Sequence, residues 1–319
     1  MCVHAQVFVA SYFSYMHIFA PHLRDRALRI IESATRAQSG KRGAPRFVVP
    51  HTHPGTCASS TRHMVRMCVD TDLACGDSKM VVPVPYVVSF PQWLVAERLP
   101  EYPRDTWLFF RGHLPKPYFD IYKVRTKIVE TLKNEPNVSV VPANVKAGAS
   151  YETHDTYLEK MLRAKFCINA GRPEPSTSAQ TLHLSSDPHE HPALAHDART
   201  RVRRPPAGFA PRGDTASAKR LYESIAAGCI PIIISDKLKL PFQRQMSWSS
   251  MSLRYTEREV SADPKRVLRD VQAMPPARVD EMRRNLMAVR HMFLWHTDTS
   301  RKSAVDSVIH ELCSWEHAR

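Results

Sequence analysis

The sequence has no run of about twenty uninterrupted apolar residues, the length that a membrane-spanning helix needs. The nearest candidate is residues 7–20, VFVASYFSYMHIFA, which is short and contains His17 and several hydroxyl groups. No basic leader precedes it. We therefore expect this segment to be a core element of a globular fold rather than a signal anchor.

The seven cysteines include no CxxC pair, and this spacing argues against a structural zinc site. Cys167 and Cys229 lie in apolar, strand-like runs, where we expect buried thiols. Cys57, Cys68 and Cys75 can supply one disulfide bond in an oxidising compartment, and the odd total leaves at least one cysteine unpaired. The cysteines alone leave the compartment open.

Sequence motifs of nucleic-acid binding are missing as well. The formal net charge of +14 favours anionic partners. Lysines and arginines are nevertheless scattered, with no zinc-finger spacing, RNP motif or basic leucine-zipper pattern, so we expect no nucleic-acid partner. The remaining anionic partners are acidic lipid headgroups, acidic polysaccharides and phosphorylated small molecules, and charge does not choose among them.

Strand-like and helix-like segments alternate along the 319 residues, of which 43% are hydrophobic. This alternation predicts βαβ units and a mostly parallel sheet, the α/β class. The pattern begins anew after a proline-rich stretch that ends at Pro103, which predicts two domains, 1–104 and 105–319. The predicted strands are 46–51, 64–69, 80–88, 107–110, 138–141, 165–169 and 229–234, and the predicted helices are 23–37, 121–133 and 156–163.

Residues 171–208 interrupt the second domain with a polar segment that contains no Ile, Phe, Tyr, Trp or Met. Such a composition predicts a disordered insert, because it cannot build a core. Two origins are open: a genuine insertion, or an intron retained in the gene model, which sequencing of the transcript would distinguish. A metal site is an alternative reading of its histidines and acids, although a flexible polar insert explains them more simply. These residues are His183, Asp187, His189, Glu190, His191 and His196.

Residues 211–236, PRGDTASAKRLYESIAAGCIPIIISD, predict a polar loop, a capped helix and a buried strand in succession. Asp214 or Thr215 is expected to cap the helix, and Gly228 stands where a left-handed residue ends a helix. The unbroken apolar run 229–234 is typical of a parallel strand that helices cover on both faces.

The start of this helix has the chemistry of an anion-binding site. A helix N-terminus offers unpaired N–H groups and the positive end of the helix dipole. Arg212, Lys219 and Arg220 surround that point in the sequence. The sequence therefore predicts that a phosphate group binds there.

The same segment resembles the signature of the exostosin family of glycosyltransferases. The resemblance is carried by PRGDT, RLYE, GCIP, SD and LPF within residues 211–242. Weaker similarities are RFVVPHTHPGTC (46–57), WLFFRG (107–112), KFCINA (165–170) and WSSMSLRYTEREV (248–260). Removal of the insert would join KFCINA to FAPRGD, as the family's sequence runs.

The resemblance implies a GT-B-like fold, in which two Rossmann-like domains face each other across a cleft. The first domain, 1–104, is expected to be incomplete. The implied activity is transfer of a sugar, with inversion, from a nucleotide-sugar to a glycan acceptor. A UDP-sugar is the first choice of donor. The implied location is the lumenal side of the Golgi membrane, through an anchor absent from this chain. The alternative is a catalytically inactive, basic glycan-binding protein of the same fold.

The resemblance also implies roles for the helix that follows the PRGDT motif. Arg212 and Arg220 would neutralise the diphosphate as it leaves. Thr215 and Ser217 would add hydroxyl and N–H donors, and Glu223 would accept hydrogen bonds from the ribose hydroxyls. Asp214 completes this donor-side set.

Two further donor-side candidates lie outside the motif. Arg111 and Gly112 would occupy the first strand-to-helix turn of the donor domain, where a small residue lets the backbone approach a pyrophosphate. Glu257 matches a late acidic position of the family.

The acceptor side offers His51 and His53 as candidate catalytic bases, because sugar transfer with inversion needs a proton acceptor at the acceptor hydroxyl. Thr52 and Pro54 depart from the family's pattern there.

Asp70-Thr71-Asp72 resembles the metal-binding DxD of glycosyltransferases of the other common fold. Three-residue motifs arise often by chance. The exostosin-like family generally works without a metal, so we expect no metal and no cofactor beyond the nucleotide-sugar.

Overall fold

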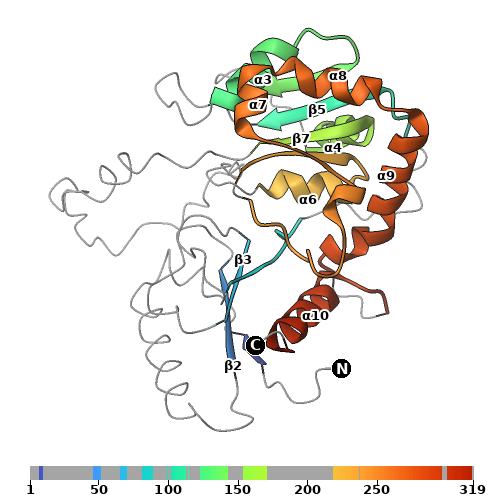
Figure 1. Cartoon of the computed structure of the whole chain (residues 1–319). Helices are drawn as coiled ribbons and strands as arrows, with labels where there is room; N and C mark the ends of the chain where they lie inside the picture. The colour runs from blue at the N-terminus through green and yellow to red at the C-terminus, as the bar shows by residue number, and fades with distance from the viewer. Residues whose placement is uncertain are drawn as a thin grey trace, which may run out of the picture.

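The chain forms two parallel β-sheets with helices packed on them in the computed structural model (Figure 1). This arrangement confirms the predicted α/β class and the two-sheet organisation of a GT-B-like fold. The structure describes residues 7–9, 46–51, 65–69, 81–88, 99, 102–112, 114, 123–142, 154–170, 218–236, 238–296 and 300–317. The predicted helix 23–37, the insert 171–208, the Asp70-Thr71-Asp72 motif and most of 7–20 lie outside these residues.

The first sheet contains four strands in the order of the sequence, all parallel. They are β1 (Val7–Val9), β2 (Arg46–His51), β3 (Val65–Cys68) and β4 (Val81–Pro83). The predicted strand 80–88 is therefore much shorter than expected. Pro83 and Pro85 explain this, because proline has no N–H to donate to a neighbouring strand.

The second sheet contains five parallel strands in the order β6-β5-β7-β8-β9. They are β5 (Thr106–Gly112), β6 (Val138–Pro142), β7 (Ala164–Ala170), β8 (Ile230–Ile234) and β9 (Leu253–Tyr255). Every residue of β8 is buried, as the apolar run 229–234 predicts for a strand covered on both faces.

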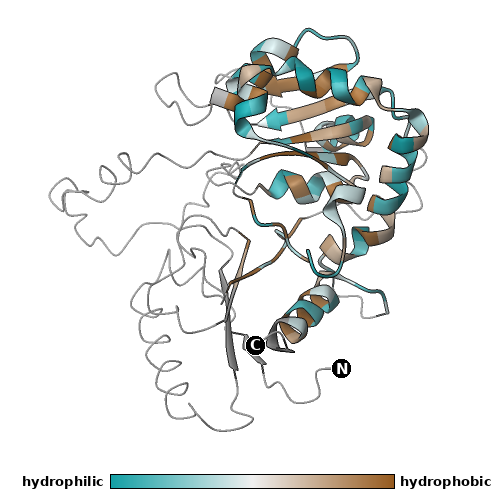
Figure 2. Cartoon of the chain, viewed as in Figure 1, coloured by the Kyte–Doolittle hydropathy of each residue, from teal (hydrophilic) through white to brown (hydrophobic). Residues whose placement is uncertain are grey.

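Helices cover both faces of this second sheet. One face is covered by α3 (Lys123–Leu132), α7 (Glu257–Ala262) and α8 (Lys265–Ala273), which pack on Ile230, Ile232 and Ile234. The other face is covered by α4 (His154–Leu162) and α6 (Lys219–Ala226). Helix α9 (Pro276–Val289) contacts both buried clusters, through Met282 on the first face and Leu286 on the second. Figure 2 shows the apolar strands between helices whose outer faces are hydrophilic. The 3-10 helices η5 (Trp248–Ser250) and η6 (Arg290–Phe293) and helix α10 (Ala304–His317) complete the described elements.

Helix α6 lies between the two sheets, below the five-stranded sheet and above β3 in Figure 1. Its apolar side chains Leu221, Tyr222 and Ile225 share one buried cluster with Met67 of β3 and Val82 of β4. The Tyr222 ring lies 5.9 Å from the ring of Tyr86, just after β4. The position of α6 therefore depends on both halves of the chain.

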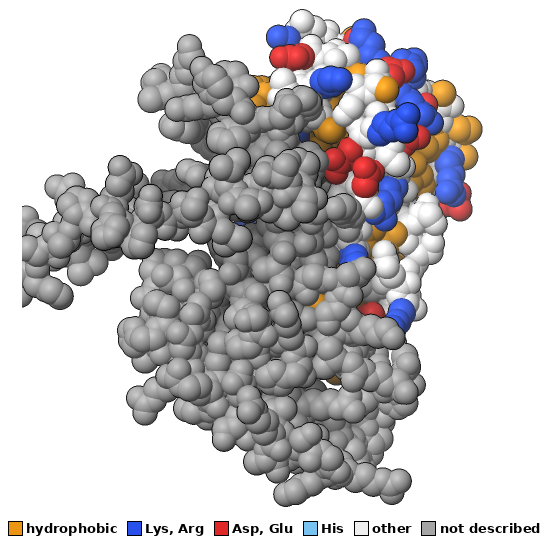
Figure 3. Space-filling view, turned by 60° about the vertical axis from the view of Figure 1, so that its left-hand side comes forward, with side chains coloured by type: hydrophobic (Ala, Val, Ile, Leu, Met, Phe, Trp, Pro, Cys, Tyr) orange, Lys and Arg blue, Asp and Glu red, His pale blue; other side chains and the backbone are white. Residues whose placement is uncertain are grey.

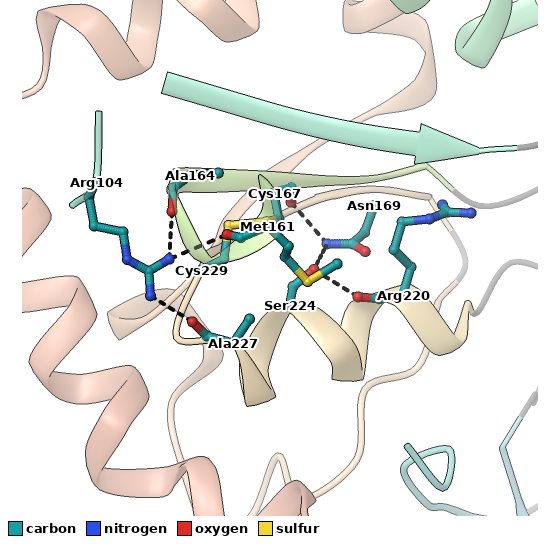
Figure 4. The surroundings of a disulfide bond; sticks show 9 residues. All are labelled: Arg104, Met161, Ala164, Cys167, Asn169, Arg220, Ser224, Ala227 and Cys229. Carbon is teal, nitrogen blue, oxygen red and sulfur yellow. Dashed lines mark hydrogen bonds between the residues drawn. A yellow bond between two sulfur atoms is a disulfide. The ribbon is translucent and has the colours of Figure 1, made fainter. Parts of the chain in front are cut away.

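Cys167 and Cys229 form a disulfide bond, so the prediction of two buried thiols is wrong (Figure 4). Parallel pairing of β7 with β8 sets Phe166 opposite Ile230, which brings the adjacent cysteines within a Cα–Cα distance of 5.8 Å. Both side chains are fully buried, as predicted. The bond joins the centre of β7 to the residue that precedes β8.

Two arginines, Arg104 and the buried Arg290, hold the C-terminal end of α6. Arg104 donates to the carbonyl oxygens of Ala227 at 2.6 Å and Ala164 at 2.7 Å, and Arg290 donates to that of Ala226 at 2.7 Å. Burial and the charge of Arg283 lower the pKa of Arg104 to about 9, so it stays charged at neutral pH. Cations are stabilised at this end of a helix by the dipole. Gly228 follows with φ of 65°, which confirms the predicted left-handed residue.

Among the described residues, no helix is long and apolar enough to cross a membrane.

Candidate functional site

The second sheet reverses its strand order between β5 and β7, because the chain runs from β5 outward to β6 and then crosses to β7 on the other side. Open parallel sheets bind ligands outside the carboxyl ends of the strands at such a point. The residues there are Arg111 and Gly112 at the end of β5, and Asn169 and Ala170 at the end of β7. We call this region the switch-point site.

Arg220 reaches this site from the first turn of α6. Its guanidinium carbon lies 5.4 Å from the ring centroid of Phe110, a fully buried residue of β5. The Nη1 atom of Arg220 is buried and has no hydrogen-bond partner among the residues that the structure describes. A buried guanidinium N–H without an acceptor is unfavourable, and an oxyanion would satisfy it. Figure 4 shows this guanidinium extending past Asn169, away from the disulfide.

Strand β5 ends later than predicted, at Gly112. Both residues belong to β5 and pair with Val141 and Pro142 of β6, whereas the sequence predicts a turn there. A Cβ atom on Gly112 would lie 2.5 Å from Cζ of Phe110. Residues 110 and 112 are two apart in a strand, so their side chains would lie on the same face of the sheet. Because Gly112 has no side chain, the Phe110 ring can lie over it. This glycine therefore supports the ring on which Arg220 lies.

We expect Gly112→Ala to lower the free energy of unfolding by about 1–3 kcal/mol, because the added methyl group overpacks a buried ring. Urea unfolding measures the change. Phe110→Leu alone and the double variant provide the control, since the smaller side chain makes room for the methyl group. The double variant should then lose less stability than the sum of the two single variants. Strict additivity would contradict a clash between these two positions.

Glu223 lies one turn after Arg220 on α6, and its carboxylate is held on both oxygens. The hydroxyl of Tyr157 in α4 donates to Oε2 at 2.8 Å, and Nζ of Lys219 lies 3.6 Å from Oε1. Burial raises the pKa of Tyr157 well above its ordinary value, and the Glu223 charge raises it further. The phenol is therefore protonated and donates at neutral pH. The charges of Arg220 and Arg111 act on the same phenol in the opposite direction, so all four side chains gather in one place.

Tyr157→Phe is expected to lower the free energy of unfolding by about 2 kcal/mol, because it removes a hydrogen bond to a charged group. The Glu223 side chain is only 13% exposed, so water replaces the lost donor poorly. Tyr255→Phe is the matched control: its hydroxyl donates at 3.0 Å to Asp270, whose side chain is 43% exposed. The control should lose less than about 1 kcal/mol. Equal losses in urea unfolding would show that Glu223 is as well solvated as Asp270.

Glu257 lies apart from this group. It begins α7 after β9, and its backbone N–H donates to Oδ1 of Asp236 at 3.1 Å. Thr256 and Glu259 form a capping box at the same helix start. Since neighbouring strands are about 4.8 Å apart, β9 lies about 10 Å from β7 in the sheet. Glu257 thus follows a strand that lies two positions from β7 in the sheet.

The remaining candidates are only partly described. Arg212, Asp214, Thr215, Ser217 and His53 lie outside the described residues. His51 is the last residue of β2, in register with Cys68 of β3.

Helix α6 starts later than predicted. Its N-cap is Ala218, with φ of −144° and no side-chain hydrogen bond, instead of Asp214 or Thr215. Ala218 is extended and buried, and the apolar face that packs in the core begins only at Leu221. A further helical turn before Lys219 would bury no additional apolar side chain of this face, and packing of such a face is what stabilises a helix.

Three residues in or beside the switch-point site were not predicted: Asn169 in the site, and Phe110 and Tyr157, which contact Arg220 and Glu223. Phe110 and Tyr157 read as ordinary core positions in the sequence. Asn169 could have been singled out in the sequence, because it is a polar residue at the end of an apolar strand. Its exposed fraction in the structure is 5%, and buried polar groups need hydrogen-bond partners.

Basic and acidic side chains are intermixed on the described face of the second sheet's helices (Figure 3). The net positive charge of the sequence is thus not gathered into one patch on that face. Local geometry, rather than overall charge, distinguishes the switch-point site.

Comparison with known proteins confirms the predicted resemblance. Residues 208–271 match the Exostosin GT47 domain, and the chain is distantly homologous to plant GT47 glycosyltransferases and to exostosins. It is 25% identical over 191 residues to "Probable arabinosyltransferase ARAD1" of Arabidopsis thaliana, covering 60% of this chain and 32% of that protein. It is 34% identical over 94 residues to human "Exostosin-like 1", covering 30% of this chain and 12% of that protein.

A third relative is "Probable glucuronosyltransferase Os03g0107900" of Oryza sativa subsp. japonica, 27% identical over 197 residues. These residues cover 59% of this chain and 34% of the rice protein. The chain thus spans about a third of the length of the Arabidopsis arabinosyltransferase and of the rice glucuronosyltransferase.

Among solved structures, HepE of Anabaena in complex with UDP-glucose is similar with a TM-score of 0.40 and 7% identity, covering 98% of this chain and 79% of that one. A glycosyltransferase from Rickettsia africae is similar with a TM-score of 0.42 and 6% identity, covering 98% of this chain and 90% of that one. TM-scores of this size show neither a shared ligand nor a shared reaction.

Proposed function

We propose that this chain is an inverting glycosyltransferase. It would transfer a sugar from a nucleotide-sugar, with a UDP-sugar as the first choice of donor, to a glycan acceptor. The observation that carries the proposal is the buried Arg220 Nη1, which has no acceptor among the described residues and lies at the switch point of a parallel sheet. The Exostosin GT47 match over residues 208–271 includes this arginine and supports the same function.

The difficult part of sugar transfer is the charge that develops on the departing nucleoside diphosphate. Arg220 and Arg212 would stabilise this charge with charge-assisted hydrogen bonds. Thr215, Ser217 and the free N–H groups at the start of α6 would bind the remaining phosphate oxygens, with Asp214 beside them.

Glu223 would accept the ribose hydroxyls with oxygens that Tyr157 and Lys219 hold in place. Arg111 lies close enough for its charge to act on the same tyrosine, so it would add to the positive field. Gly112 would act through the Phe110 ring. Glu257, two strands away, would take part only if the donor extends along the edge of the sheet.

His51 and His53 are proposed as the catalytic base on the acceptor side. His51 ends β2, so it lies at the carboxyl edge of the first sheet, where side chains of a Rossmann-like domain meet ligands. A base there would take the proton of the acceptor hydroxyl while the diphosphate leaves from the second sheet.

The names of two relatives, an arabinosyltransferase and a glucuronosyltransferase, favour a pentose or a uronic acid as the transferred sugar. The disulfide between Cys167 and Cys229 supports a lumenal location in the Golgi, because disulfides persist in oxidising compartments. We propose that transfer needs no metal, since arginines take over the stabilisation of the diphosphate. Activity abolished by a chelator would overturn this last point.

Isothermal titration calorimetry with UDP tests donor binding, and transfer assays with a panel of UDP-sugars then test catalysis. We expect UDP to bind and at least one donor to be turned over in the presence of a glycan acceptor. Binding of heparin or another acidic polysaccharide without any binding of UDP would overturn the proposal. It would favour a non-catalytic glycan-binding protein of the same fold.

A further inference from the structure

We infer that Asn169 accepts a hydrogen bond from a hydroxyl group of the bound ligand, next to the group that Arg220 binds. The inference rests on the proposed function, because it concerns a hydroxyl-bearing ligand at the switch-point site. Asn169 is the next-to-last residue of β7, and its side chain is buried beside α6 (Figure 4). In the sequence, Asn169 lies within the KFCINA segment (165–170), which assigns it no role.

The orientation of the Asn169 amide is fixed by its neighbours. Its Nδ2 donates to the carbonyl oxygen of Cys167 at 2.9 Å and to Oγ of Ser224 at 3.4 Å. Ser224 in turn donates to the carbonyl oxygen of Arg220 at 2.7 Å, so its oxygen is left to accept. A flipped amide would set its oxygen against the Cys167 carbonyl, where neither oxygen has a hydrogen to share.

The other amide atom, Oδ1, is buried and has no hydrogen-bond partner among the described residues. A buried acceptor left without a donor is unfavourable by about 1–3 kcal/mol. Figure 4 shows Oδ1 facing the Arg220 side chain, on the side opposite to the Nδ2 hydrogen bonds. Two polar groups of opposite type, the Oδ1 acceptor and the Arg220 Nη1 donor, thus both belong to the switch-point site and both lack a partner in the described structure.

The chemistry of the two groups tells what would satisfy them. A phosphate oxygen accepts from Arg220 but has no hydrogen for Oδ1 at neutral pH. The missing donor must therefore belong to a group that adjoins the phosphate. In a sugar nucleotide the diphosphate is flanked by the ribose and the transferred sugar, and the donors of both are hydroxyl groups. The uracil N–H lies farther along the molecule.

Access and rigidity both fit this role. Figure 4 shows the Arg220 side chain on the same side of Asn169 as Oδ1, so an anion bound to Arg220 would bring its adjoining hydroxyl groups to that side of the amide. Asn169 itself is held by β7, which pairs with β8, and by the disulfide two residues earlier at Cys167. A polar group on a rigid strand discriminates between ligands better than one on a loop.

The test compares three probes by calorimetry: UDP, UDP-glucose and inorganic pyrophosphate. Asn169→Ala should weaken binding of a hydroxyl-bearing probe about tenfold, the effect of one hydrogen bond to a buried acceptor, and should change pyrophosphate affinity by less than about twofold. Loss with both UDP and UDP-glucose identifies the ribose, whereas loss with UDP-glucose alone identifies the sugar. Ser224→Ala is the matched control, since it removes one partner of Nδ2 and leaves Oδ1 in place.

Asn169→Leu is the second variant in case Asn169→Ala does not fold, because leucine has a similar branched shape and no hydrogen-bonding atom. Equal loss of affinity for all three probes, or unchanged affinity for both nucleotides, would overturn the inference and leave the proposed function standing. A wild-type protein that binds neither UDP nor pyrophosphate would overturn both.

Discussion

Arg220→Ala is expected to weaken the binding of UDP by about 10- to 100-fold. Hydrogen bonds to charged groups contribute about 1.5–3 kcal/mol each, and a factor of ten corresponds to about 1.4 kcal/mol. The guanidinium is already placed on the Phe110 ring, and its Nη1 has no acceptor to give up within the part of the chain that the structure describes. Little of the interaction energy is therefore spent on breaking existing bonds when the diphosphate binds.

Arg220→Lys separates charge from geometry. Lysine keeps the positive charge but lacks the planar fork that binds two phosphate oxygens and stacks on an aromatic ring. We expect the lysine variant to recover less than half of the lost binding energy. Calorimetry with UDP at constant salt measures all variants, because ionic strength screens these interactions.

The control for net charge is Arg266→Ala. Arg266 is an exposed residue of α8 that pairs with Glu259 and Asp270, on the opposite face of the sheet from α6. Its removal lowers the net charge by the same amount and should change UDP affinity by less than about twofold, since exposed charges are screened. If Arg266→Ala weakened UDP binding as much as Arg220→Ala, overall charge rather than the switch-point site would explain the binding.

Period and composition were sufficient to predict four of the five strands of the second sheet; β9 (Leu253–Tyr255) was not predicted. Strands 138–141 and 165–169 extend in the structure to Val138–Pro142 and Ala164–Ala170, and helix 121–133 appears as Lys123–Leu132. These elements were predictable because apolar runs and helical spacing report directly on burial. The predicted strand 80–88 is too long, because the prolines at 83 and 85 interrupt strand pairing in spite of the β-branched residues around them.

Some residues of the candidate site were predictable from the sequence and others were not. Arg220 and Glu223 were predictable because both lie on one helix, where spacing fixes their relation. Asn169 and Phe110 were not, because their roles depend on which strands are neighbours in the sheet and on atoms left without partners. The same holds for Cys167 and Cys229, which become neighbours only through the pairing of β7 with β8.

Removal of the Cys167–Cys229 disulfide should lower the free energy of unfolding by about 4 kcal/mol. The cysteines are 62 residues apart, and cross-linking a loop of this length removes that much chain entropy from the unfolded state in the loop-closure description. The effect is large because the closed loop includes the whole of residues 168–228. We expect Cys167→Ala, Cys229→Ala and the double variant to unfold at markedly lower urea concentrations than the wild-type protein.

The three variants also test the cause of this loss. Either single substitution breaks the bond completely, so each should destabilise the protein nearly as much as the double variant, and the effects should not add. Loss of packing alone would instead make the two single effects sum to the double effect. A reducing agent gives a further measurement. Because Cys313 is also disulfide-bonded, the agent acts on both proteins, and it should lower the unfolding midpoint of the wild-type protein more than that of the double variant. Because the bond fixes β7 next to the C-terminal end of α6, the double variant should also bind UDP more weakly before it unfolds.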